Sequence, residues 1–334
     1  MKLFITGISA LDFYRRTYPA HRAPGLSSYG NITKHTVDFA HRDDDIWSLA
    51  PSWVTPDFLA PENGRLHVLV NSAAKRTTSK TVASHVWSNH LPAGSCFDCG
   101  GDVLVASPGF IFLQLANTLD LLHLIALGDE LCGFYSFDEA SERGVRKRVV
   151  PLTNKEELRC YLESAAGIRG QKAALSALDY VVEQSASPME TLDEMLLCLP
   201  PRYGGYGLPL PSMNHPIPLS EKAQALIGVP RCHGDICWPD VPLDVEHNGG
   251  FDHSSPHAQS NDRARVNAIA EAGYEVIELT DGQVSNLAAF EVIALRIASK
   301  VGKRIRPQQL GATKQRLHLR KTIYAWNRAY GRCR

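Results

Sequence analysis

The chain has 334 residues, of which 44% are hydrophobic, and this composition excludes global disorder and predicts two or three folded domains. Its 35 Lys and Arg residues balance its 35 Asp and Glu residues, so the total charge favours no class of partner. The charges are nevertheless unevenly placed, because no acidic residue follows Glu291, whereas twelve Lys or Arg residues lie between Arg296 and Arg334.

The N-terminus and the apolar stretches predict a cytoplasmic protein. The first residues, MKLFITGISALDFYRR, contain no apolar core followed by a small-residue cleavage site. The longest apolar stretch, 110–127, is interrupted by Gln114, Asn117, Asp120 and His123, so no membrane segment and no membrane partner are expected.

The eight cysteines are scattered along the chain, which favours reduced thiols. Cys96 and Cys99 form one CxxC pair without a second pair, and Cys232, His233 and Cys237 form a loose cluster. Neither set has the usual four-ligand spacing, so no zinc site is expected.

The first 185 residues predict a separate α+β domain. A helix begins at Ser9, residues 17–64 are expected to be loops, and Ser107-Pro108 predicts the start of a helix with Pro in its first turn. Strands are expected at 66–70, 81–88 and 102–106, and helices at 108–119, 120–132, 154–164 and 169–184. A small polar stretch at 184–188 predicts a domain boundary.

Residues 186–305 predict a second domain with the order α–β–β–α–β–α. A helix is expected at 188–199, a Pro- and Gly-rich loop at 200–230, a strand–turn–strand at 233–246, a helix at 260–272, a strand at 275–280 and a helix at 284–302. Residues 306–334 are expected to form a basic C-terminal extension, with a helix over 313–328.

Two carboxylates are expected on neighbouring strands, Asp235 in the first strand of this hairpin and Glu246 in the second. Carboxylates that converge in this way can hold a divalent metal against a phosphodiester. The alternative is an edge hairpin whose Asp244 and Glu246 face solvent, as side-chain alternation allows. The glycines that follow Asn248 favour close approach by a ligand.

Other polar residues near this hairpin have two interpretations each. Glu190 stands where a capping box beginning at Ser187 would place it, or it contributes to a metal site. Asp262 and Arg265 would share a helix face, either in a surface ion pair or at the site. His253 lies in the loop after Glu246 and is either solvated or functional.

The basic C-terminal segment interleaves Tyr324, Trp326 and Tyr330 with Lys and Arg. Phosphate neutralisation combined with aromatic stacking is typical of nucleic-acid binding, and the alternative is a solvated terminal helix.

Residues 186–304 resemble the very-short-patch-repair-like branch of the PD-(D/E)XK nuclease superfamily. The resemblance rests on an ordered set of residues: Glu190, Arg231, Asp235, Trp238-Pro239, Val245-Glu246, Gly249, His253, Asp262-Arg263, Arg265, Gly273-Tyr274 and Val276. It implies a restriction-endonuclease-like mixed sheet flanked by helices, and a DNA endonuclease that depends on Mg²⁺ or Mn²⁺.

The resemblance also implies roles for these residues. Asp235 would be the bridging metal ligand, Glu246 the second ligand, and Glu190 would hold a water or a second ion. His253 would act as a general acid or base. DNA is the expected partner, with contacts expected at Arg265, Arg263, Lys303, Arg304 and Arg306.

Asn248 departs from the family pattern, because relatives usually carry E-x-D-G where this chain has E-H-N-G. An amide oxygen can coordinate a metal but adds no charge, so weaker metal binding is expected at this candidate catalytic position. The alternative function is therefore a nuclease-fold DNA-binding regulator or antitoxin with reduced or no activity. A structural protein without a nucleic-acid partner is a third hypothesis.

Residues 1–180 resemble, more distantly, the AbiEi-type antitoxin domain of abortive-infection systems. The carriers are SAL at 9–11, DVLVASP at 102–108 and LGDEL at 127–131. Together the two resemblances imply a repair or phage-defence protein, with a cognate toxin or defence-system protein as a further partner.

Overall fold

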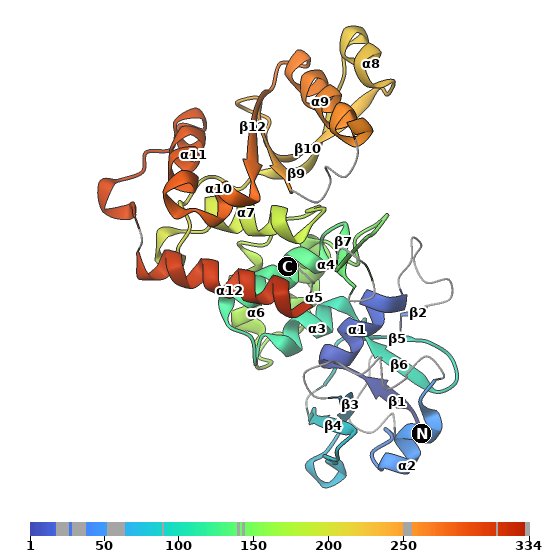
Figure 1. The fold of residues 1–334 in the computed structure, drawn as a ribbon. Helices are drawn as coiled ribbons and strands as arrows, with labels where there is room; N and C mark the ends of the chain where they lie inside the picture. Colours follow the sequence, from blue (N-terminus) through green and yellow to red (C-terminus); the bar gives the residue numbers. More distant parts are fainter. Residues whose placement is uncertain are drawn as a thin grey trace. The chain divides into compact units, whose positions relative to one another are not determined.

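The computed structural model describes residues 1–17, 27–28, 38–51, 64–88, 90–138, 141, 144–249, 256–311 and 313–330. These residues form a mixed α+β structure whose sheets contain both parallel and antiparallel strands (Figure 1). The chain divides into two compact units. Unit 1 consists of Met1–Cys132, Ser136–Ser141 and Arg148–Val181, and unit 2 of Gly133–Tyr135, Glu142–Lys147 and Val182–Arg334.

Unit 1 contains a six-stranded sheet in the order β2-β5-β6-β1-β3-β4. Its strands are β1 (Leu3–Ile5), β2 (Ser27–Ser28), β3 (Leu66–Val70), β4 (Val82–Val86), β5 (Cys96–Asp98) and β6 (Val103–Ala106). The central strands β1 and β6 are parallel and fully buried, which explains why their sequences, LFI and VLVA, are continuously apolar rather than alternating.

Six helices accompany this sheet: α1 (Gly7–Thr17), α2 (Asp43–Leu49), α3 (Pro108–Leu115), α4 (Leu121–Leu131), α5 (Lys155–Ser164) and α6 (Gln171–Leu178). Their starts follow local capping chemistry. The Ser107 hydroxyl accepts from the Phe110 amide, and the Asn154 side chain accepts from the Glu157 amide. Helix α2 lies within the stretch expected to be loop, and α6 ends at Leu178 rather than near 184.

A buried ion pair joins two distant segments of unit 1. Arg15 in α1 donates from Nε and Nη2 to the two carboxylate oxygens of Glu130 in α4, at 2.8 and 2.7 Å. The Glu130 side chain is fully buried and that of Arg15 is 5% exposed. The paired charges therefore satisfy each other where water cannot.

Removing one member of this pair should destabilise unit 1 strongly. Arg15→Met leaves the Glu130 carboxylate buried without its bidentate partner, and we expect a loss of about 3–5 kcal/mol in unfolding free energy, measured by urea denaturation. Arg16→Met, at an exposed neighbouring position, is the control. Equal midpoints for the two variants would contradict the assignment.

Unit 2 contains a four-stranded sheet in the order β12-β11-β10-β9, formed by β9 (Ser212–Pro218), β10 (Arg231–Trp238), β11 (Leu243–Asn248) and β12 (Glu275–Thr280). Strands β9, β10 and β11 are successively antiparallel, and β12 is parallel to β11. A parallel neighbour requires a crossover, which α9 (Pro256–Glu271) supplies.

The expectation of a loop over 200–230 was wrong, because this segment contains β9 and the helix α8 (Glu221–Ile227). Pro216 and Pro218 argue against a strand in a sheet interior, but β9 is an edge strand, where a missing backbone N–H is tolerated. Helix α8 has a Ser220 N-cap and a left-handed Gly228 C-cap. Its Ala223 packs with Ile217, Cys237 and Ile269 in one core cluster.

Helix α7 (Pro188–Cys198) is buried along nearly its whole length. It contacts β10 and also α12 (Lys314–Tyr330), and Figure 1 shows it between the sheet and α12. Leu319, Ile323 and Trp326 form the buried stripe of α12. Residues 306–334 thus belong to unit 2 rather than forming a separate extension.

The basic and aromatic residues of α12 are largely committed to this packing. Arg316, 1% exposed, lies 3.9 Å from the ring centroid of Tyr206 and pairs with Glu291 at 3.2 Å, and Trp326 is 5% exposed. The side chain of Tyr330 lies outside the described residues. These contacts account for Arg316 and Trp326 as core residues rather than as a surface for nucleic acid.

The remaining elements of unit 2 are α10 (Asp281–Ser285) and α11 (Leu287–Lys300), while β7 (Tyr135–Phe137) and β8 (Val145–Lys147) pair in a separate two-stranded sheet. In the described part of the chain, no helix combines the length and the apolar character needed to cross a bilayer.

Candidate functional site

Two neighbouring residues of β11 reach opposite faces of the sheet in unit 2. Glu246 pairs with Arg265 of α9, whereas the ring of His247 contacts Asp193 of α7. Side chains alternate along a strand, so α9 and α7 cover opposite faces. One strand therefore carries two polar clusters, one beneath each helix.

The cluster beneath α9 is built on Asp235 and Glu246, which the antiparallel pairing of β10 and β11 brings side by side. Arg265 Nη2 donates to Asp235 Oδ1 at 3.1 Å and to Glu246 Oε1 at 3.0 Å, and Nη1 lies 2.7 Å from Glu246 Oε2. The same Nη2 donates to the backbone carbonyl of His233. The two expected carboxylates thus converge on a single cation.

The polar face of the hairpin is not solvated, which excludes the edge-hairpin alternative. Asp244 is fully buried and accepts a hydrogen bond from the Cys237 thiol at 3.1 Å, while Glu246 is 5% exposed. Burial and the charge of Asp235 raise the pKa of Glu246 to about 11, and burial also raises the pKa of Asp244. Three carboxylates therefore surround one guanidinium.

Gly234 gives this cluster its room. A Cβ at Gly234 would lie 2.5 Å from Asp244 Oδ1 and 2.5 Å from Cys237 Sγ. Both are buried groups that have no free space to move into. The glycine in RCHGD thus permits the close packing of Asp244 against β10.

Glu190 satisfies both interpretations of its position. Its amide donates to the Ser187 hydroxyl at 3.1 Å, and its Oε2 accepts from the Ala186 amide at 2.8 Å, one residue before the expected capping-box partner. Burial and the charge of Asp235 raise the pKa of Glu190 to about 8. It therefore caps α7 while lying within electrostatic reach of Asp235.

The cluster beneath α7 was not anticipated from sequence. The His247 ring lies between two carboxylates, with Nδ1 2.6 Å from Asp193 Oδ2 and Nε2 3.2 Å from Asp281 Oδ1. The His247 backbone amide donates to Asp235 Oδ2 at 3.0 Å, which links the two clusters. The signal available in the sequence was the alternation itself, which sends His247 away from Glu246.

This arrangement favours the charged form of His247. Burial of the ring opposes the charge, but the hydrogen bond from Asp193 and the charges of Asp193 and Asp281 prevail and raise the pKa of His247 to about 9. Burial raises the pKa of Asp193, while the imidazolium lowers it. For the pair, we place the proton on the imidazole at neutral pH.

The raised pKa makes the stability of unit 2 depend on pH. The pKa of His247 rises from 6.5 to about 9 on folding, so its contribution is complete below about pH 6.5 and is lost as the pH rises through 9. We expect a decrease of about 3 kcal/mol in unfolding free energy over this range, and a smaller pH dependence in His247→Gln.

An NMR titration of the imidazole carbons provides the direct measurement, with the His247 signal assigned by its loss in His247→Gln. His318→Gln, at an exposed position of α12, is the control. A His247 midpoint near the ordinary value of 6.5, or parallel pH profiles for wild type and His247→Gln, would show that the carboxylates do not hold a proton on this ring.

The structure places the other expected residues apart from the carboxylate pair. Asn248 Nδ2 donates to Glu278 Oε2 at 2.7 Å, on β12. Arg263 is exposed on α9. His253 lies outside the described residues.

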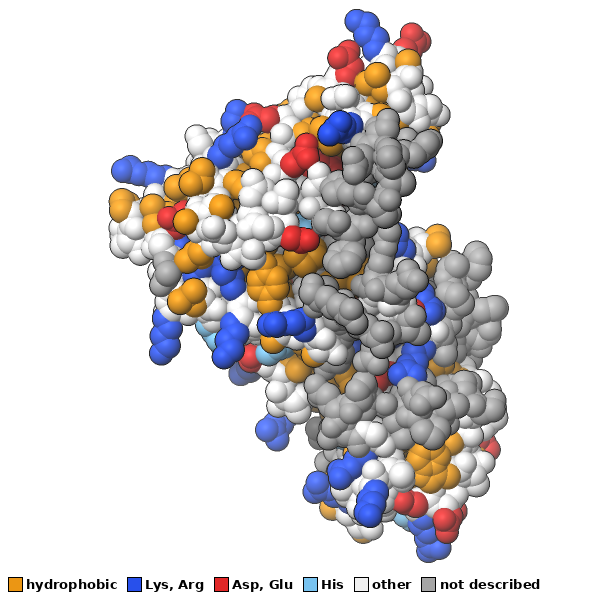
Figure 2. Space-filling view, viewed as in Figure 1, with side chains coloured by type: hydrophobic (Ala, Val, Ile, Leu, Met, Phe, Trp, Pro, Cys, Tyr) orange, Lys and Arg blue, Asp and Glu red, His pale blue; other side chains and the backbone are white. Residues whose placement is uncertain are grey.

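The expected DNA contacts after α11 lie in a different region of unit 2. Lys303, Arg304 and Arg306 are exposed in the connection from α11 to α12. Figure 1 shows this connection on the other side of β12 from α9. Figure 2 shows basic side chains interspersed with acidic ones on the face in view, so no single field of positive charge marks a nucleic-acid path there.

The carboxylate pair fits a divalent cation in its chemistry. Asp235 and Glu246 offer oxygen ligands that already meet at one cationic point, and oxygen ligands are those that Mg²⁺ and Mn²⁺ prefer. Among the described residues, no group of three His, Cys, Asp or Glu side chains is arranged to hold a metal ion. The fit is thus a two-carboxylate fit, with Arg265 at the point where the ligands meet.

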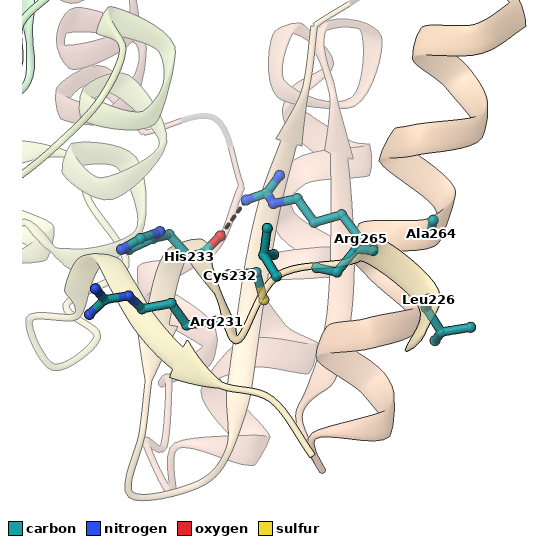
Figure 3. Close-up of a pocket in the computed structure, with 8 residues that line it drawn as sticks. Leu226, Arg231, Cys232, His233, Ala264 and Arg265 are labelled. Carbon is teal, nitrogen blue, oxygen red and sulfur yellow. Dashed lines mark hydrogen bonds between the residues drawn. The ribbon is translucent and has the colours of Figure 1, made fainter. Parts of the chain in front are cut away.

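A pocket of about 520 Å³ adjoins this point (Figure 3). Arg231, Cys232 and His233 of β10 line it from one side, and Ala264 and Arg265 of α9 line it from the other. Leu226 and Val229, 49% and 44% exposed, form its apolar rim. Arg265 therefore belongs both to the pocket wall and to the carboxylate pair.

Comparison with known proteins adds no relative: no family model matches the chain, and neither do the curated proteins or the solved structures that were searched.

Proposed function

We propose that unit 2 is a metal-dependent DNA endonuclease domain whose paired carboxylates are Asp235 and Glu246. The observation that carries the proposal is the convergence of these two side chains, from antiparallel β10 and β11, on one cation. The order of a Glu-bearing α7, three antiparallel strands, a crossover helix and a parallel β12 is compatible with the restriction-endonuclease-like sheet that the sequence resemblance implies.

The residues of the chain divide the work in this proposal. Asp235 and Glu246 would hold Mg²⁺ or Mn²⁺, which when bound polarises the phosphate and lowers the pKa of a water. The His247 amide fixes the orientation of Asp235. Glu190, with a pKa of about 8, can accept and release a proton near neutral pH.

Substitution of the carboxylates tests this reaction. With Mg²⁺ or Mn²⁺ and nicked, mismatched or supercoiled DNA, we expect Asp235→Asn and Glu246→Gln to lower the cleavage rate by at least about a hundredfold, because each removes a charge that holds the ion. Asn248→Asp should strengthen metal binding and raise the rate at limiting metal concentration, since it adds a carboxylate beside the pair.

Asp240→Asn is the matched control, because Asp240 is an exposed acid in the turn between the same two strands. Its cleavage rate should equal that of the wild type. Absence of cleavage on every substrate, or equal cleavage by Asp235→Asn and wild type, sinks the proposal.

A second candidate function is a DNA-binding regulator or antitoxin built on the same fold and lacking cleavage. Two observations favour it. The Arg265 guanidinium already satisfies both carboxylates, and Asn248 pairs with Glu278 instead of joining them. The distant resemblance of residues 1–180 to AbiEi-type antitoxins is consistent with this alternative, in which a toxin or defence-system protein is a further partner.

This second function predicts DNA binding that depends on salt and is unaffected by EDTA. Neutralising Lys303, Arg304 and Arg306 together with Gln should reduce the slope of log K against log salt by about 0.9 for each lost phosphate contact on duplex DNA. The control replaces Lys80, Arg169 and Lys172, which are exposed in unit 1.

Fluorescence anisotropy with labelled duplex DNA measures both slopes in the full chain. Truncation after residue 304 is unsuitable, because it removes the buried stripe of α12 and would unfold unit 2. A slope that is unchanged in the first variant, or reduced equally in both, would count against a DNA-binding role for these three residues.

A further inference from the structure

Arg265 makes every contact that a guanidinium can make with the carboxylate pair. Nη1 is used by Glu246, and Nη2 is shared among Asp235, Glu246 and the carbonyl of His233. The Glu246 and Asp235 side chains are 7% and 19% exposed, so solvent alone does not compensate their charges. The guanidinium is thus the internal counter-cation of the site.

A divalent ion and this guanidinium cannot occupy the pair together. Both need the oxygens of Asp235 and Glu246 that face each other, and two cations a few ångströms apart repel strongly where solvent is limited. Binding of one therefore requires displacement of the other.

Arg265 has a place to go when displaced. Its side chain is 35% exposed, in contrast to the buried acids, and it already forms part of the wall of the adjoining pocket. Figure 3 shows it reaching from α9 towards the backbone of His233, with Arg231 extending from the same strand. A rotation of the Arg265 side chain into this pocket would bring a second guanidinium to the side where Arg231 lies.

We propose that Arg265 is a displaceable plug: it holds Asp235 and Glu246 in place without metal, yields that position to a divalent cation, and then binds a backbone phosphate with Arg231 in the adjoining pocket. The phosphate step rests on the proposed nuclease function, whereas the competition between Arg265 and a divalent cation does not. Two guanidiniums and the exposed apolar rim at Leu226 and Val229 suit a phosphate with its attached nucleoside.

Manganese binding to the full chain, without DNA, tests the competition directly. Free Mn²⁺ is measured by its electron paramagnetic resonance signal during titration of wild type, Arg265→Gln and Arg263→Gln. We expect Arg265→Gln to bind Mn²⁺ at least about tenfold more tightly than wild type, because the competing cation is gone. Arg263→Gln, on the same helix but exposed, should match the wild type.

The double variant Asp235→Asn with Arg265→Gln locates the ion, and it should lose the gain. Arg265→Lys guards against a folding defect, since it keeps one charge but cannot bridge both carboxylates, and it should show a smaller gain. The thermal midpoint of Arg265→Gln should fall in EDTA and recover in Mn²⁺. Equal or weaker Mn²⁺ binding in Arg265→Gln and Arg265→Lys than in wild type overturns the plug.

The phosphate step has its own readout. Affinity for a short duplex at constant ionic strength should rise with Mn²⁺ in wild type, and this rise should vanish in Arg231→Gln and in Arg265→Gln. A rise that persists in both variants overturns the phosphate step. A gain in Mn²⁺ affinity without any DNA cleavage supports the plug and refutes the nuclease, whereas metal-dependent cleavage without that gain does the reverse.

Discussion

The alternation of side chains along β11 is the constraint on which unit 2 depends. Adjacent residues of a strand must face opposite ways, so Glu246 and His247 cannot serve the same cluster. Glu246 is held by a cation from α9, and His247 is held by acids from α7 and α10. A shift of one residue in the pairing of β11 would exchange these two environments and leave buried charges facing like charges on both sides.

Buried cations with assigned acids recur throughout the protein. Arg15 pairs with Glu130 in unit 1, while in unit 2 Arg265 pairs with Asp235 and Glu246, and Arg316 pairs with Glu291. Each cation offsets the desolvation of its partner, and each fixes two segments that are distant in sequence. The equal totals of acidic and basic residues thus reflect, in part, an interior that contains charge as well as a neutral surface.

The parts of the structure that sequence predicted are those governed by local rules. The α+β class, the strand–turn–strand that pairs Asp235 with Glu246, and the capped starts of α3, α5 and α7 follow from alternation and capping. Strand β9 was missed because prolines argue against a strand until its edge position is known.

The remaining site residues could not be predicted, because their partners are set by tertiary packing. His247 occupies a position that a family motif treats as unspecified, and Asp193 lies in a mostly apolar helix. Nothing local distinguishes Arg265 from Arg263, yet one bridges two buried acids and the other is exposed. The charge run of the C-terminal helix likewise concealed the buried stripe that packs on α7.

The packing of α12 on α7 also orders events during synthesis. Helix α7 ends at Cys198 and α12 begins at Lys314, and the Asn327 side chain donates to the carbonyl of Pro188 at the start of α7. The ribosome therefore releases the strands that carry Asp235 and Glu246 while one side of α7 still lacks its cover. Until α12 emerges, Leu192, Leu196 and their neighbours expose an apolar surface on which a nascent-chain chaperone would be expected to act.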